Sequence, residues 1–189
     1  MRKGDRTKAR IERAAVRLIG RRGVRAATIR AIAKEAGVTE GLLYRYFRNK
    51  GALISEVWSG CMIPMLEAKR RLVAEHVNHD QFICDWIQFS YRAFDDNPQA
   101  FSVLFLQQIP RLDKASTALK IEQFDLFRSV LEEARAAGEL RWDDTFLAAS
   151  LFAAQLLVIP RLILTGQIDG PASRYLATMT NALRRLLFK

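Results

Sequence analysis

The chain has 189 residues, of which half are hydrophobic, and carries 30 basic against 20 acidic side chains. This hydrophobic content supports a buried core and excludes a disordered chain. The charge is unevenly spread: residues 1–50 hold 15 basic and 4 acidic side chains, a net charge of +11, whereas residues 51–189 are close to neutral. This asymmetry predicts that the first quarter of the chain contacts nucleic acid or another anionic surface.

Several functional classes find no support in the sequence. The two cysteines, Cys61 and Cys84, are too few for a disulfide framework and lack the CxxC spacing of metal and redox sites. The first residues contain no apolar signal segment, so we expect a cytoplasmic protein. Hydrolase, dinucleotide and nucleotide-triphosphatase motifs are absent, and no nucleophile with its base is recognisable. We therefore expect no enzymatic activity and no cofactor.

Hydrophobic residues follow a helical period from the first segment onward. The first helix has its apolar stripe at Ile11, Ala14, Ala15 and Leu18 and is predicted to end near Gly20. A second helix is predicted from Ile29 to Ala36, with Thr28 as N-cap and Gly37 as C-cap. A short third helix is predicted from Thr39 to about Phe47. Two short helices joined by a tight turn containing glycine are typical of a helix-turn-helix.

The rest of the chain is also predicted to be helical, which gives an all-α protein of about nine helices without a sheet. A long helix begins near Lys50, and turn signals divide the remaining residues into segments 79–96, 101–109, 113–137, 146–164 and a last helix after Gly170-Pro171. Segment 113–137 is predicted to bury Ile121, Phe124, Phe127, Leu131 and Ala134. We expect a helix-turn-helix DNA-binding domain at residues 1–50 and a helical ligand-binding and dimerisation domain at residues 51–189.

The short helix 39–47 has the features of a DNA recognition helix. Leu43 and Phe47 lie four residues apart and are predicted to anchor it on the preceding helices. Its opposite face presents Gly41, Leu42 and Arg45, which suit close approach, a thymine methyl and a guanine or phosphate respectively. The hydroxyls of Tyr44 and Tyr46, on the flanks, and Lys50, at the next helix start, are placed to meet phosphates. An alternative is that Leu42 packs under the N-terminal arm.

Residues 28–50, TIRAIAKEAGVTEGLLYRYFRNK, followed by Leu53, closely resemble the DNA-binding segment of the TetR family of transcriptional regulators. The resemblance is specific over about residues 7–60 and rests on helix count and order beyond them. It implies an all-helical homodimer, usually a repressor, whose C-terminal domain binds a small-molecule inducer. It also implies contacts with the operator. Thr28 and Lys50 are expected to contact phosphates, and the recognition helix is expected to contact the operator through Thr39, Glu40, Gly41, Leu42, Tyr44, Arg45 and Tyr46. Gly20 and Gly51 depart from the family pattern and put local helix stability in doubt.

Two further groups of side chains admit two interpretations each. His76 and His79 are three residues apart beside Glu75 and Asp80, a spacing that a metal site can use. A polar junction between helices is the favoured interpretation, and we predict no metal. An aromatic and methionine-rich set either forms core or lines an apolar effector pocket. The residues predicted for that pocket are Met62, Trp86, Phe89, Phe101, Phe105 and Phe127.

The segment 146–164 is apolar around nearly its whole circumference and about as long as a membrane span. It contains Pro160 and Arg161, and an arginine is costly in a bilayer. Burial against a second subunit explains the same pattern, so we predict a homodimer formed by this helix and the last helix, and no membrane contact.

Two functions of different classes are consistent with these features. The first is a sequence-specific repressor that is released from a palindromic operator by an apolar or aromatic ligand. The second is a basic module that binds nucleic acid or an anionic membrane without sequence preference. Competition by unrelated duplex DNA separates them, because specific binding is typically ~10³–10⁷ tighter than non-specific binding.

Overall fold

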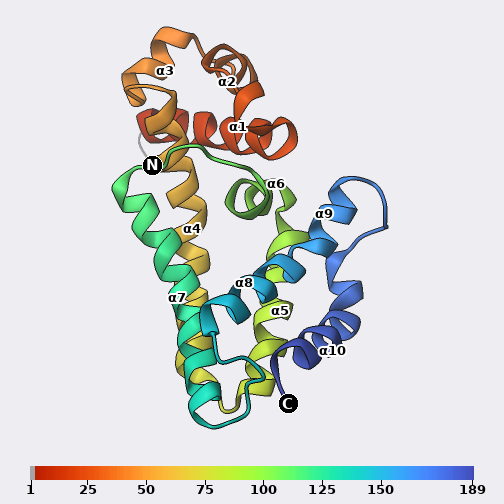
Figure 1. Ribbon diagram of the computed structural model, residues 1–189. Coiled ribbons are helices and arrows are strands. Elements are labelled where there is room, and N and C mark those ends of the chain that lie inside the picture. The colour runs from red at the N-terminus through yellow and green to blue at the C-terminus, as the bar shows by residue number, and fades with distance from the viewer. Residues whose placement is uncertain (1–2) are drawn as a thin grey trace. The chain divides into compact units, whose positions relative to one another are not determined.

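The computed structural model describes residues 3–189 and is all-α, as predicted (Figure 1). The described residues contain no strand, and Leu140 and Phe188 form an isolated antiparallel bridge. The helices are α1 (Lys3–Ala26), α2 (Ile29–Ala36), α3 (Glu40–Tyr46), α4 (Lys50–Glu75), α5 (His79–Asp96), α6 (Pro98–Phe101), α7 (Lys114–Ala136), α8 (Thr145–Leu156), α9 (Val158–Leu164) and α10 (Leu176–Leu187). A π-helical turn, η1 (Ser102–Leu106), follows α6, and a 3-10 turn, η2 (Ala172–Tyr175), precedes α10.

The chain divides into two compact units. The first comprises residues up to 63 together with Asn97–Leu119, and the second comprises Pro64–Asp96 and Lys120–Lys189. Helices α4 and α7 each begin in the first unit and end in the second. These units are defined by contacts, so the functional division at residue 50 stays a prediction.

Helix α1 is longer than predicted because Gly20 does not end it. Gly20 is helical and buried, and the chain turns instead at Gly23, whose φ of 80° and ψ of 166° are accessible to glycine. Gly20 lies where α6 crosses α1: a Cβ there would be 2.6 Å from the carbonyl oxygen of Gln99. Ser102 Oγ also donates a hydrogen bond to the Gly20 carbonyl at 3.1 Å. Close packing of two helices, rather than helix termination, therefore explains this glycine.

The second unit is built around stacked aromatic rings from α5, α7 and α8. Phe127 lies 5.1 Å from Trp86 and 4.2 Å from Phe152 between ring centroids, and Phe82 packs against both Trp86 and Phe127. Helices α5 and α10 run antiparallel and are joined near both ends. Arg184 pairs with Asp80, and the Asp95 carboxylate accepts from the backbone of Ala172 and Ser173.

Two predictions for the C-terminal half are wrong. The apolar segment 146–164 is two helices, because Leu157 takes φ −82° and ψ −6° between α8 and α9. Pro160 then falls in the first turn of α9, where a missing N–H costs nothing. Ile121, predicted to be buried, is exposed on α7, and Phe124 is half-buried, whereas Phe127, Leu131 and Ala134 are buried as predicted.

Segment Thr145–Leu164 is, within the described residues, the one stretch apolar and long enough to cross a membrane by composition. Only 33% of its most apolar window is buried within the chain. Much of its apolar surface is therefore exposed in the single chain.

Candidate nucleic-acid interface

The turn between α2 and α3 is fixed by hydrogen bonds that the sequence predicts. Thr28 Oγ1 accepts from the Ala31 N–H at 3.1 Å, and Thr39 Oγ1 accepts from the Leu42 N–H at 3.2 Å. Gly37 ends α2 in the left-handed region, with φ 62° and ψ 42°. Its N–H and that of Val38 return to carbonyls of the last turn, which closes α2 and directs the chain into α3 within two residues.

Helix α3 is anchored by the two residues predicted for that purpose. Leu43 and Phe47 are fully buried, and the Phe47 N–H donates to the Leu43 carbonyl at 3.0 Å. Phe47 adopts an extended conformation, with φ −131°, so the helix ends there. Burial of two large apolar side chains on a seven-residue helix holds the helix by packing rather than by intrinsic helix propensity. The opposite face of α3 consequently has a defined orientation.

Most residues on the outer side of α3 are exposed, and Figure 1 shows where this short helix lies in the chain. Glu40, Gly41 and Arg45 are exposed, and Tyr44 retains 52% of its accessible surface. A Cβ at Gly41 would meet no atom within 4 Å, so the backbone is open to close approach there. An exposed tyrosine beside an arginine on a rigid helix can contact base edges and phosphates in a major groove.

Leu42 and Tyr46 are less exposed than the predicted DNA-facing arrangement implies. Both are half-buried. The Tyr46 hydroxyl lies beside Gly4 in α1, 3.7 Å from where a Cβ on that glycine would be. Tyr46 therefore contacts the start of α1, and the central part of the exposed face belongs to Gly41, Tyr44 and Arg45.

Lys50 and Thr28 begin helices on either side of α3. The ammonium of Lys50 is half-buried and donates to the Val24 carbonyl at 2.7 Å. An ammonium has three donors, so this bond fixes Lys50 and leaves two for an anion. Thr28 is exposed, and its hydroxyl, which accepts from Ala31, still has its own proton to donate.

Ion pairs neutralise little of the positive charge of this region. Arg17 pairs with Glu35 at 2.9 Å, and Lys8 pairs with Glu56. The hydrogen bond to Glu56 raises the pKa of Lys8 above its ordinary value. Within residues 3–189, Arg30, Arg45 and Arg48 pair with no carboxylate and are exposed. Arg30 and Arg48 were not predicted as DNA contacts, although their positions beside Thr28 and Lys50 in the sequence were a usable signal.

The residues predicted for the effector pocket fall into both units. In the second unit, Trp86 and Phe127 are buried and in contact, while Phe89 on α5 is half-buried. In the first unit, the Phe101 and Phe105 rings lie 4.9 Å apart and Met62 is buried. Sequence reasoning missed Lys69, a buried lysine whose ammonium lies 4.3 Å from the centre of the Trp86 ring. Lys69 stands among other charged residues, between Glu67 and the pair Arg70-Arg71, so no local pattern marks it as buried.

The thiol of Cys61 has the properties of a structural cysteine. Burial raises the pKa of this thiol to about 11, and Glu12 contributes to the shift. A thiol with such a pKa is protonated at neutral pH and is a poor nucleophile.

Comparison with known proteins agrees with this geometry. Residues 11–57 match the family model described as "Bacterial regulatory proteins, tetR family". The HTH-type transcriptional repressor KstR2 of Rhodococcus jostii is 27% identical over 178 residues, which cover 89% of this chain and 87% of that protein.

Two solved structures show the same fold along almost the whole chain. A TetR family transcription regulator from Marinobacter aquaeolei aligns with a TM-score of 0.81 and 16% identity over 100% of both chains. The regulator FadR from Bacillus subtilis, solved in complex with stearoyl-CoA, aligns with a TM-score of 0.75 and 18% identity, covering 93% of this chain and 96% of FadR. The helix-turn-helix of α2 and α3, the family match that includes it and the full-length repressor relative together show that this chain belongs to the TetR family of transcriptional regulators.

Proposed function

We propose that this chain is a homodimeric repressor that binds a palindromic operator through α3 and releases it when an apolar or aromatic effector binds the second unit. The observation that carries the proposal is the outward face of α3, where Gly41, Tyr44 and Arg45 are exposed on a helix anchored by Leu43 and Phe47. A rigid helix with a polar, basic outer face in the most positively charged part of the chain is suited to sequence-specific binding in a major groove.

The dimer is supported by the apolar surface of α8 and α9. Phe146 and Leu147 retain 61% and 45% of their accessible surface, and Val158 and Leu164 are also exposed. Exposed apolar residues on one continuous segment are typical of a subunit interface. An isologous dimer presents two α3 helices, and their spacing of about one helical turn of DNA, ~34–36 Å, requires an inverted repeat. The final helix, α10, is predicted to complete this interface.

The effector site is placed at the aromatic cluster of α5 and α7, around Trp86 and Phe127. FadR of Bacillus subtilis binds an acyl-CoA, a ligand with a long apolar chain, and has the same fold. In the present chain, packed aromatic rings provide an apolar wall, and Lys69 lies beside it. Burial lowers the pKa of Lys69 to about 7, and a bound anion would favour its charged form. These features support an apolar effector that carries an anionic group.

The experiment that tests this function measures binding to the promoter region upstream of the chain's own coding sequence. Fluorescence anisotropy with a duplex containing an inverted repeat from that region is compared with a scrambled duplex at physiological salt. We expect a preference of at least ~10³ for the repeat. Arg45→Ala should weaken binding to it by ~1–3 kcal/mol, since a good base contact has that value. Arg92→Ala, an exposed arginine on α5, is the matched control and should bind normally.

The same assay tests release and the alternative function. Long-chain acyl-CoA and free aromatic acids are added to the complex, and we expect at least one to lower operator affinity by about 5–150-fold, the usual range of allosteric coupling. Equal binding to repeat and scrambled duplexes would instead support the basic module without sequence preference. The cytoplasmic location stays a prediction.

A further inference from the structure

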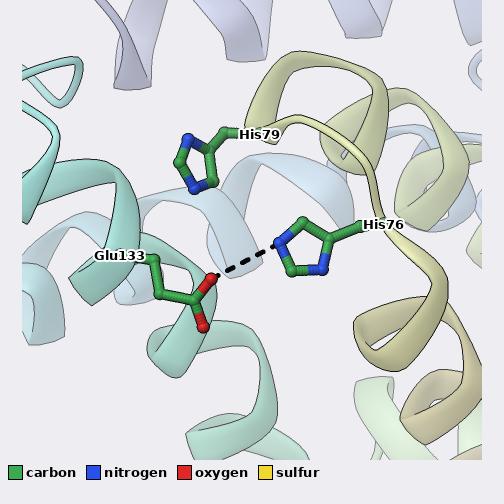
Figure 2. A group of neighbouring side chains, drawn as sticks. All are labelled: His76, His79 and Glu133. Atoms are coloured by element: carbon green, nitrogen blue, oxygen red, sulfur yellow. Dashed lines mark ion pairs between the residues drawn. The ribbon is translucent and has the colours of Figure 1, made fainter.

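Two histidines and a glutamate meet in the second unit, where the turn between α4 and α5 lies beside α7 (Figure 2). His76 follows the last residue of α4, His79 is the first residue of α5, and Glu133 is on the last turn of α7. One ligand atom from each of the three lies within 4.8 Å of the other two. Figure 2 shows a ring nitrogen of each histidine and a carboxylate oxygen of Glu133 turned toward the same space.

Hydrogen bonds leave the second ring nitrogen of each histidine free to bind a metal. His76 Nδ1 is 2.5 Å from the Val73 carbonyl oxygen, and His79 Nδ1 is 2.7 Å from Oε2 of Glu139. A carbonyl and a carboxylate only accept, so Nδ1 carries the proton in both rings. In the neutral imidazole, Nε2 then has a lone pair. Metal-binding histidines typically donate their other N–H to a backbone carbonyl or a carboxylate in this way.

We infer that His76, His79 and Glu133 form a binding site for a divalent transition metal ion, with Zn²⁺ as its preferred occupant in the cell. Two imidazoles and one carboxylate are ligands that Zn²⁺ favours, at bond lengths of about 2.0–2.2 Å. Tetrahedral ligands at that distance lie ~3.3–3.5 Å apart. His76 Nε2 and Glu133 Oε2 are already 3.5 Å apart. The other separations are at most 4.8 Å, so side-chain movements of about 1 Å would bring the three ligand atoms to tetrahedral distances.

Burial and neighbouring charges also suit a metal site. The side chains of His76 and His79 retain only 15% and 16% of their accessible surface, whereas Glu133 retains 58%. The histidines are thus held by packing, and His76 lies against the Phe82 ring at 5.4 Å. The exposed glutamate leaves a path for the ion to enter. A water molecule would take the fourth position.

The two acidic residues that the sequence places beside the histidines are not the ligands. Asp80 is bound to Arg184 of α10, and Glu75 is not part of the cluster. The third ligand comes instead from α7, which cannot be recognised from the spacing of the histidines alone. An ion bound here would connect the α4–α5 turn to the C-terminal end of α7 and stabilise the second unit. This inference is independent of the operator and of the effector.

The test uses the full chain, freed of metal by a chelator and dialysed, and ZnCl₂ as the probe. Competition with a chromophoric zinc indicator should show one Zn²⁺ per chain, and Mg²⁺ should not compete because it prefers oxygen ligands and an octahedral shell. The thermal unfolding midpoint should rise by roughly 5–10 °C when free Zn²⁺ is a hundredfold above its Kd.

Variants distinguish this site from adventitious binding. His79→Gln and Glu133→Gln each remove a ligand and should abolish both the stoichiometric binding and the thermal shift. Glu139→Ala removes only the hydrogen-bond partner of His79 and should weaken zinc binding by about 10–100-fold. Glu75→Gln removes a neighbouring charge and should bind zinc like the wild type. Circular dichroism of each metal-free variant verifies its folding. Absence of stoichiometric zinc, or zinc binding that survives in both ligand variants, would overturn the inference.

Discussion

Replacing Gly20 by alanine should destabilise the protein, even though alanine is the better helix former. In a helix interior, alanine is favoured over glycine by about 1 kcal/mol. At position 20 the added Cβ would lie 2.6 Å from the Gln99 carbonyl oxygen and 2.8 Å from its Cα. These are backbone atoms and cannot rotate away, so α1 and α6 must separate. Overpacking of this kind costs about 1–3 kcal/mol, and we expect the upper part of that range to apply.

The net loss for Gly20→Ala is therefore about 1–2 kcal/mol, which corresponds to a fall of roughly 2–8 °C in the unfolding midpoint. Gly60→Ala is the matched control, because Gly60 lies inside α4 and a Cβ there meets no atom within 4 Å. That variant should gain about 0.5–1 kcal/mol from helix propensity. Thermal and urea unfolding are followed by circular dichroism at one protein concentration. A Gly20→Ala variant as stable as Gly60→Ala would refute the packing argument.

Three further changes test other features of the structure. Lys50→Ala should reduce the slope of log affinity against log salt concentration by about 1 and weaken binding to all DNA sequences equally. Filter binding across salt concentrations measures this slope, and an unchanged slope would exclude a phosphate contact. Leu147→Glu should raise the dissociation constant of the dimer at least ~10-fold in sedimentation equilibrium. Val77→Glu, at a position that is 91% exposed, is the control and should leave it unchanged. Equal effects of the two substitutions would place the interface elsewhere. Burial lowers the pKa of Lys69 to about 7, whereas its pKa in the unfolded chain is ~10.4. Between these pH values the unfolded state binds more protons than the folded state. The free energy of unfolding should therefore rise with pH from 7 to about 10, by up to ~1.4 kcal/mol per pH unit. Urea unfolding at several pH values should show that Lys69→Met removes this slope, and parallel slopes would contradict it.

Local signals made the helix-turn-helix predictable. Thr28, Gly37 and Thr39 act on backbone groups within four residues of themselves, so their effects can be read from the sequence alone. The anchoring of α3 by Leu43 and Phe47 follows from helical spacing in the same way. The all-α fold is likewise predicted by periodicity, which needs no knowledge of the tertiary structure.

The features that the sequence did not reveal depend on residues far apart in the chain. Gly20 is a typical helix terminator in isolation, and only the approach of Gln99 shows why it lies inside α1. Glu133 joins His76 through the packing of α7 against the α4–α5 turn, and no local pattern marks it. The break at Leu157 could be predicted in part. Pro160 indicates that the helix is interrupted nearby, but the residue at which the break falls depends on where α9 begins.

The two threonine caps have a consequence for how operator specificity can change. Each hydroxyl holds the first turn of its helix through its oxygen and keeps its hydrogen for a phosphate in the proposed complex. Serine is the one substitution that retains both functions, because asparagine and aspartate can cap but lack the hydroxyl proton. Helix stability and DNA affinity thus restrict Thr28 and Thr39 together. Gly41 and Arg45 have no capping role. They are therefore the positions at which selection or protein engineering can change the operator sequence that is bound without destabilising the DNA-binding helices.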